Sequence, residues 1–183
     1  MRSGRNIVSP RSDLEGASVR SYCQLRQALD SYPGDLPYYT VSIFNCARTA
    51  GRHPLPLLTA SQIALVRDLL NAALARLAAL KTVSRPLHGD PHLDNLLFTT
   101  DGPLWLDFES ACRGPVEWDL SALPGSELLP QHDAAALALL RQVRSTCVVV
   151  WCASKERPSP KDQEAVTFHI AKLKSLGPAG DPA

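Results

Sequence analysis

The feature of this chain that most constrains its fold is a hairpin signal at residues 96–106. Two short apolar runs, residues 96–98 and 104–106, flank the dipeptide Asp101-Gly102. Asp-Gly tolerates the positive φ angle that a tight hairpin turn requires, so the pattern predicts two antiparallel strands. The second strand leads directly into Asp107. Because a hairpin returns the chain on itself, Asp107 is expected beside the residues that precede the first strand.

Oxygen-bearing side chains are concentrated around this hairpin. Asp90 lies in the segment before it, Asn95 follows five residues later, and Asp107 comes directly after the second strand. The hairpin therefore predicts that Asp90, Asn95 and Asp107 converge on one small volume. Proteins usually hold Mg²⁺ through one or two carboxylates together with substrate phosphates. The sequence thus indicates a phosphoryl-transfer site with Mg²⁺ as its metal.

At these residues the chain resembles the aminoglycoside phosphotransferase-like kinases, which are distant relatives of protein kinases. The catalytic loop of that family reads HGDxxxxN, and residues 88–95 match it in every defining position. The family's metal motif is an Asp at the end of an apolar strand, a Gly seven residues later and then an Asp-Leu pair. Here these are Asp107, Gly114 and Asp119 with its following leucine.

The resemblance implies a role for each of these residues. Asp90 is the catalytic residue that accepts the proton of the substrate hydroxyl, while Asn95 and Asp107 hold Mg²⁺. His88 and Asp119 give structural support to the catalytic loop. The implied reaction is ATP-dependent transfer of the γ-phosphoryl group to a hydroxyl of a small molecule. Known acceptors in the family are aminoglycosides, choline, sugars and homoserine.

The same residues permit a second interpretation, a metal-dependent hydrolase. His88, Asp90 and His92 have a spacing that can bind Zn²⁺ or Mn²⁺. The residues that would complete such a ligand set are Asp94, Asp107 or Glu109. The hydrolase interpretation does not explain the Gly-Pro and Trp-Asp-Leu motifs that follow.

Helical patterns dominate the rest of the chain. Apolar residues recur at helical spacing over residues 18–32, 61–80 and 134–153, and a last helix is expected from Pro160. Thr59 and Gln62 predict a capping box, and Asp133 and Ser159 are expected to cap the two last helices. Residues 35–57 are apolar but weakly patterned. The fold class is therefore α+β and mostly helical, which fits the large lobe of a protein-kinase-like fold with a small catalytic β-hairpin.

A complete enzyme of the family has a small β-rich lobe before the large one, with a phosphate-covering loop and a Lys that pairs with the phosphates. The 87 residues before His88 contain no Gly-rich strand–turn–strand, and Lys81 is their only lysine. We therefore expect a large-lobe domain at residues 18–176, a missing small N-terminal lobe, and frayed ends at residues 1–17 and 177–183. The chain is then truncated and needs a separate small-lobe polypeptide or self-association. The alternative is an inactive kinase-like fragment or binding module.

Composition disfavours several other classes of protein. The formal net charge of +1 speaks against an electrostatically driven nucleic-acid binder. No run of eighteen apolar residues occurs, so no membrane span is expected. Five cysteines without a CxxC pair are typical of reduced thiols. We therefore expect a cytoplasmic protein whose partner is a small-molecule hydroxyl compound, with no nucleic acid and no membrane.

Overall fold

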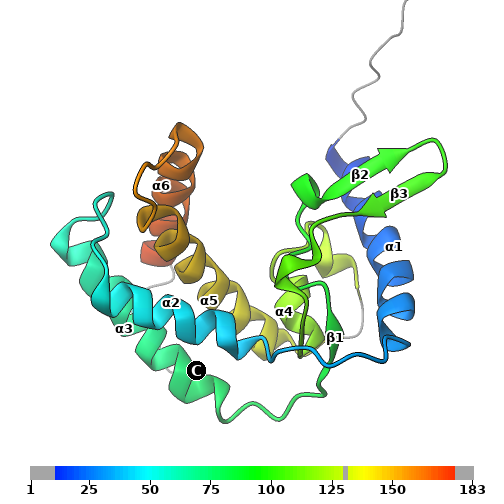
Figure 1. The fold of residues 1–183 in the computed structure, drawn as a ribbon, viewed down its shortest axis with the longest axis horizontal. Coiled ribbons are helices and arrows are strands. Elements are labelled where there is room, and N and C mark those ends of the chain that lie inside the picture. Colours follow the sequence, from blue (N-terminus) through cyan, green and yellow to red (C-terminus); the bar gives the residue numbers. More distant parts are fainter. Residues whose placement is uncertain (1–10, 130–131, 176–183) are drawn as a thin grey trace, which may run out of the picture.

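A computed structural model describes residues 11–129 and 132–175 of the chain (Figure 1). The described chain is mostly helical and carries two antiparallel sheets of two strands each. Its helices, 3₁₀ helices (η) and strands follow in the order α1 (Arg11–Asp30), α2 (Thr40–Arg52), α3 (Ala60–Leu77), β1 (Arg85–Leu87), η1 (Leu93–Asn95), β2 (Leu96–Thr99), β3 (Gly102–Trp105), η2 (Phe108–Ser110), β4 (Cys112–Gly114), α4 (Val116–Leu120), η3 (Ser126–Leu128), α5 (Ala134–Ala153) and α6 (Pro160–Ser175).

The predicted hairpin is confirmed. Strands β2 and β3 pair with Leu96 opposite Trp105 and Thr99 opposite Gly102. Gly102 has φ +119°, which residues with a Cβ rarely adopt. Strand β3 ends at Trp105, one residue earlier than the expected apolar run, so one residue separates it from Asp107.

The helix-capping predictions are confirmed too. Thr59 and Gln62 form a complete capping box at the start of α3, each side chain bonding the backbone of the other. The Asp133 carboxylate accepts hydrogen bonds of 2.9 and 3.0 Å from two backbone amides at the start of α5. The Ser159 hydroxyl accepts from the Asp162 amide in the first turn of α6. Short polar side chains therefore fix where these three helices begin.

Other parts of the fold differ from the sequence-based expectations. Helix α1 begins at Arg11, so residues 11–17 are helical, while residues 1–10 and 176–183 lie outside the described residues. The weakly patterned segment forms α2, which buries Ile43, Cys46 and Ala50. A second sheet, β1 with β4, places Leu87 opposite Cys112. The prediction of one small hairpin therefore missed the sheet that flanks the catalytic loop.

The described chain has two regions, visible on either side of Figure 1. The helical half comprises α2, α3, α5 and α6, and it holds most of the larger apolar core. The catalytic half comprises α1, both sheets, α4 and the loops between them. Its smaller apolar core joins Tyr22 of α1 to Trp105 of the hairpin and Leu137 of α5. Helix α5 contributes to both cores and therefore fixes one half relative to the other.

Helix α5 is also the one described helix long and apolar enough to cross a membrane by length and composition. Its 18-residue apolar window is 61% buried inside the protein. Helices α2, α3, α4 and α6 all contact it. This apolarity is therefore explained by its position at the centre of the fold.

Candidate active site

A buried carboxylate fixes the backbone of the loop that follows β1. Asp119 of α4 is fully buried, and its two oxygens accept hydrogen bonds from the His88 amide (3.0 Å) and the Gly89 amide (2.8 Å). The Tyr22 hydroxyl of α1 donates a third, at 2.9 Å. Burial raises the pKa of Asp119, and these donors oppose that effect by favouring the ionised carboxylate. Three elements far apart in the sequence are thus joined at one side chain.

Gly89 allows the loop to pass close to the segment after the hairpin. Its φ is +91°, and a Cβ at this position would collide with the backbone oxygen of Ser110. Any other residue would therefore require both a left-handed conformation and a shift of the neighbouring backbone.

His88 is fully buried and uses both ring nitrogens within the protein. Nδ1 accepts from the Asp90 amide at 3.3 Å, so the proton is placed on Nε2, which donates to the Leu106 carbonyl at 2.9 Å. The ring also packs against Phe108, with 4.5 Å between ring centroids. His88 thus connects the loop to the end of the hairpin and has no nitrogen left to bind a metal.

The Asp90 carboxylate lies half-buried between the Arg144 guanidinium and the His92 ring. Arg144 Nη1 donates to Oδ1 at 3.0 Å, and His92 Nε2 lies 3.4 Å from Oδ2. Burial by itself would raise the pKa of Asp90, but the His92 hydrogen bond and the Arg144 charge outweigh it and lower the pKa. Asp90 is therefore held in its ionised form with a defined orientation.

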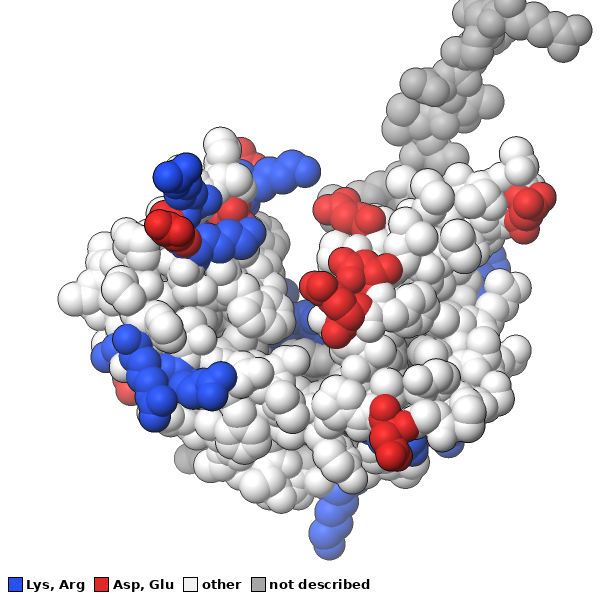
Figure 2. Space-filling view, in the orientation of Figure 1, with Lys and Arg blue, Asp and Glu red and all other residues white. Residues whose placement is uncertain are grey.

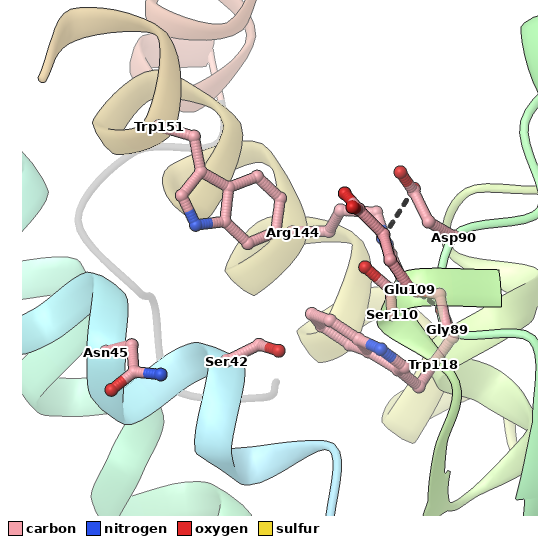
Figure 3. Close-up of a pocket in the computed structure, with 9 residues that line it drawn as sticks. All are labelled: Ser42, Asn45, Gly89, Asp90, Glu109, Ser110, Trp118, Arg144 and Trp151. Carbon is pink, nitrogen blue, oxygen red and sulfur yellow. Dashed lines mark hydrogen bonds and ion pairs between the residues drawn. The ribbon is translucent and has the colours of Figure 1, made fainter. Parts of the chain in front are cut away.

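Arg144 of α5 is a site residue that the sequence analysis did not identify. Besides Asp90, its buried guanidinium donates to the Gly89 and Trp118 carbonyls and to the Ser121 hydroxyl, at 2.7–2.9 Å. It also stacks on the Trp118 ring, 3.9 Å from the centroid. Figure 3 shows the ion pair with Asp90. The signal that could have identified it is a single arginine on the apolar face of the helix at residues 134–153.

Asn95 and Asp107 are connected to the loop through the backbone. Asn95 Nδ2 donates to the Asp90 carbonyl at 3.0 Å, and the Asn95 carbonyl accepts from the Leu106 amide at 2.8 Å. Asp107 comes next, with φ 60° and ψ 70°, the left-handed conformation that no other described non-glycine residue adopts. Such strain persists where surrounding structure imposes it, and it often marks functional sites.

The donor atoms at Asn95 and Asp107 fit a magnesium ion. Because Asn95 uses its amide nitrogen within the protein, its amide oxygen remains as a ligand atom. The Asp107 side chain is exposed, so its carboxylate is accessible. An amide and a carboxylate oxygen suit a hard cation, which would neutralise the charge of substrate phosphates. Their sharing of one ion stays a prediction.

The side-chain set required by the hydrolase interpretation does not form in the described part of the chain. No group of three or more His, Cys, Asp or Glu side chains in residues 11–129 and 132–175 is arranged to hold a metal ion. His88, one of the expected ligands, is engaged at both nitrogens. The geometry therefore favours oxygen ligands on the hairpin over a His–carboxylate centre.

A cavity of about 360 Å³ opens beside Asp90 (Figure 3). Helix α2 contributes Ser42 and Asn45, α5 contributes Trp151, and Glu109 lies near Asp90 on the opposite side. The residues from α2 were missed because their segment lacked a readable helical pattern. The cavity gives space for a small molecule next to the Asp90 carboxylate.

Comparison with known protein families identifies the class to which the chain belongs. Residues 23–145 match the model of the phosphotransferase enzyme family, which covers well over half of the chain. The chain belongs to this family, and the resemblance seen in the catalytic-loop and metal motifs is confirmed. No curated protein sequence matches the chain.

Solved structures share the fold at low sequence identity. The choline kinase LicA from Streptococcus pneumoniae is 16% identical, with a TM-score of 0.67 over 90% of this chain. The enzyme APH(2″)-IIia, solved with GDP and kanamycin, is 17% identical with a TM-score of 0.63 over 92%. The amicoumacin kinase hAmiN, solved with AMP-PNP, Ca²⁺ and Ami, is 12% identical with a TM-score of 0.63 over 97%. The fold is that of a kinase-like large lobe.

The chain spans only part of these proteins. It covers 65% of the length of LicA and 64% of each of the other two. The activity of a full-length enzyme is therefore a separate question for this chain.

Proposed function

We propose that this chain is the acceptor- and metal-binding part of an ATP-dependent small-molecule kinase. In this reaction the γ-phosphoryl group of ATP passes to a hydroxyl of the acceptor. Asp90 orients that hydroxyl and takes its proton as the new O–P bond forms. Asn95 and Asp107 would hold Mg²⁺ against the phosphates, while His88 and Asp119 keep the loop in place.

The observation that carries this proposal is the fixed position of Asp90 at the edge of a cavity. Arg144 and His92 keep its carboxylate ionised and oriented. The Asn95 side chain donates to the Asp90 backbone carbonyl and so connects Asp90 to the hairpin that leads to Asp107. A base with a lowered pKa is a weak proton acceptor in the ground state, so orientation is its first contribution. Phosphoryl transfer depends mostly on positioning and charge neutralisation, which this arrangement serves.

We propose that the chain by itself binds nucleotide weakly. The solved relatives are longer, and the two nucleotide-containing structures described above hold GDP and AMP-PNP. In this family the small lobe supplies the phosphate-covering loop and the Lys, and neither was found before His88. A separate small-lobe polypeptide is the partner that would supply them. An inactive binding module is the alternative.

An exposed apolar face on the hairpin supports such a partner. Leu97 and Leu104 pair across β2 and β3, on the opposite face from the buried Leu96 and Trp105. Leu97 is 49% exposed and Leu104 52%, and Leu106 continues the same face. Exposed apolar patches of this kind mark interaction sites. We infer that a small lobe covers this face and that self-association is the competing outcome, distinguishable by light scattering of the purified chain.

The decisive experiment measures transfer of radiolabelled γ-phosphate from Mg·ATP to a panel of hydroxyl compounds at millimolar concentration. We expect slow transfer by the chain alone, because the proposed small-lobe partner would supply part of the groups that position the phosphates. Asp90→Asn should lower that rate by about 100-fold or more, which is a typical contribution of a positioned acid–base group. Asp101→Asn, a matched change at the exposed tip of the same hairpin, should leave the rate unchanged.

Two results would contradict the proposal. One is equal transfer by the wild-type chain and Asp90→Asn. The other is a reaction that needs Zn²⁺ and proceeds without ATP, which would restore the hydrolase alternative. Micromolar Mg·ATP binding by the monomer would contradict only the proposal that the chain by itself binds nucleotide weakly.

The cysteines support a cytoplasmic location as part of the same proposal. All five are free thiols, and Cys46, Cys112 and Cys147 are buried. Burial raises the pKa of the Cys112 thiol to about 12, so this thiol is unreactive at neutral pH.

A further inference from the structure

A second and larger cavity, of about 670 Å³, extends from Asp90 towards α6. It shares Asp90, Arg144 and Trp151 with the first cavity, so the two meet at the ion pair. One end is formed by the catalytic loop with His92 and Asp94. The other end is formed by α5 and α6, and the proposed phosphoryl transfer assigns no role to the residues of α6.

The α6 wall of this cavity is a cationic stripe. Lys161, Ala165, His169 and Lys172 all line it. These positions follow one another at intervals of four, four and three residues, which places them on a single face of the helix. Lys155, from the C-terminal side of α5, lies at the same end. Three lysines and a histidine, with the one carboxylate of Asp162, thus line the part of the cavity far from the catalytic loop.

The charges of this cavity are only partly balanced. Arg144 pairs with Asp90 at 3.0 Å, and Lys155 pairs with Asp162 at 2.6 Å. Within residues 11–129 and 132–175, Lys161 and Lys172 make no ion pair. Figure 2 shows Lys and Arg atoms over α6 with acidic atoms among them, and further acidic atoms on the facing wall of the hollow. The α6 end therefore carries uncompensated positive charge.

His169 adds an unsatisfied polar atom at the same place. Its Nδ1 is buried and is one of two such described side-chain nitrogen or oxygen atoms without a hydrogen-bond partner. Burial, and then the charge of Lys172, lower the pKa of His169. A buried polar group without a partner is uncommon in folded proteins and calls for one. His169 therefore adds a polar group to the cavity lining between the two lysines.

We propose that this cavity binds an acceptor that carries an anionic group, a phosphate or a carboxylate. The anionic group lies among Lys161, His169 and Lys172, and the hydroxyl of the same molecule reaches Asp90. This proposal names the acceptor class for the phosphotransferase proposed above and rests on it for the hydroxyl's role. Lysine suits a phosphate or carboxylate as a compact point charge, and the one arginine of the cavity is already engaged.

A cationic group fits the α6 end of this cavity poorly. There it would lie beside Lys161 and Lys172, which make no ion pair with any described residue, and like charges at short range repel. APH(2″)-IIia was solved with kanamycin, and LicA is a choline kinase, so the inferred acceptor differs in charge from the compounds in those names.

The test is a titration of the purified chain, followed by amide chemical shifts, with three anions: inorganic phosphate, glycerol 3-phosphate and D-glycerate. Glycerol is the neutral reference and choline the cationic one. We expect at least one anion to bind more tightly than glycerol and choline. Lys161→Gln and Lys172→Gln should each weaken this binding by about tenfold, as expected for loss of a hydrogen bond to a charged group. Lys174→Gln, a lysine of α6 that does not line the cavity, is the matched control.

The outcomes separate this inference from the proposed function. If no anion binds more tightly than glycerol, or if Lys174→Gln weakens binding as much as Lys172→Gln, the anionic site is wrong. Asp90→Asn should retain anion binding while losing phosphoryl transfer. Lysine-dependent anion binding with no Asp90-dependent transfer would leave the site standing and overturn the kinase reaction. A preference between glycerol 3-phosphate and glycerate would distinguish phosphate from carboxylate.

Discussion

The helical half and the catalytic half of this protein are held together by different forces. Leu140 and Val143 in the helical half are almost completely buried among apolar side chains. In the catalytic half the side chains of His88 and Asp119 are buried to the same extent, yet both make specific hydrogen bonds. Apolar packing tolerates rearrangement of similar volumes, whereas a buried polar network is stable only when every donor has its acceptor.

This difference explains how a small loop can be positioned accurately. The loop at residues 88–92 has no regular secondary structure of its own. The Asp119 carboxylate accepts hydrogen bonds from the loop amides of His88 and Gly89. Arg144 donates to the Gly89 carbonyl and to the Asp90 carboxylate. Because Arg144 belongs to α5, the apolar core of the helical half sets where this guanidinium lies. The helical half therefore determines the geometry of the catalytic half.

The largest effect on stability is expected for Asp119→Ala. The change leaves the His88 amide, the Gly89 amide and the Tyr22 hydroxyl without an acceptor inside the protein. We expect a loss of about 3–5 kcal/mol in the free energy of unfolding, in the range found when buried charged groups lose their partners. Urea denaturation measures it. A loss below about 1 kcal/mol would show that the polar network is not what holds the catalytic half.

A smaller loss of stability, caused by a change in the helical half, is expected for Leu140→Ala. This side chain is fully buried in the helical half, so its truncation should cost about 2–4 kcal/mol through lost burial and the cavity left behind. Amide chemical shifts of the catalytic loop should stay close to wild type, because no hydrogen bond there involves Leu140. Large shifts at Gly89 would contradict the division into two differently stabilised halves.

Tyr22→Phe removes one donor and leaves the apolar contact with Trp105 in place. We expect a loss of about 1–2 kcal/mol, because the other two donors to Asp119 remain. Loss of the phenol donor should also raise the pKa of Asp119 further. An effect as large as that of Asp119→Ala would mean that Tyr22, and not the carboxylate, is the main support.

The smallest effect concerns the pH dependence of His92. Its hydrogen bond to Asp90 raises the pKa of His92 above 6.5, against opposing contributions from burial and Arg144. A raised folded-state pKa contributes stability below the unfolded-state pKa, and this contribution is lost as pH rises through the folded-state pKa. A ¹³C or ¹⁵N titration of the ring should show a midpoint above 6.5 in the wild type. Asp90→Asn should lower that midpoint to 6.5 or less. An unchanged midpoint would contradict the statement that Asp90 raises the pKa of His92.

Sequence patterns predicted the local features of this fold and missed the long-range ones. The hairpin turn and the caps at Thr59 and Asp133 depend on residues within a few positions of one another, so they were readable. The ion pair between Arg144 and Asp90 joins residues 54 positions apart, and the Tyr22–Asp119 bond joins residues 97 apart. Nothing in the local spacing specifies such contacts. The site residues on α2 were hidden for the same reason, since tertiary packing defines that helix.

The measurement that tests the proposed site most directly is Mn²⁺ binding in the presence of ADP, followed by electron paramagnetic resonance. Mn²⁺ replaces Mg²⁺ at oxygen ligands and is visible even when binding is weak. The proposed site predicts nucleotide-dependent binding that Asp107→Asn and Asn95→Ala each reduce strongly and that His92→Gln leaves almost unchanged. Binding lost in His92→Gln but retained in Asp107→Asn would contradict it and place the metal at His92 instead.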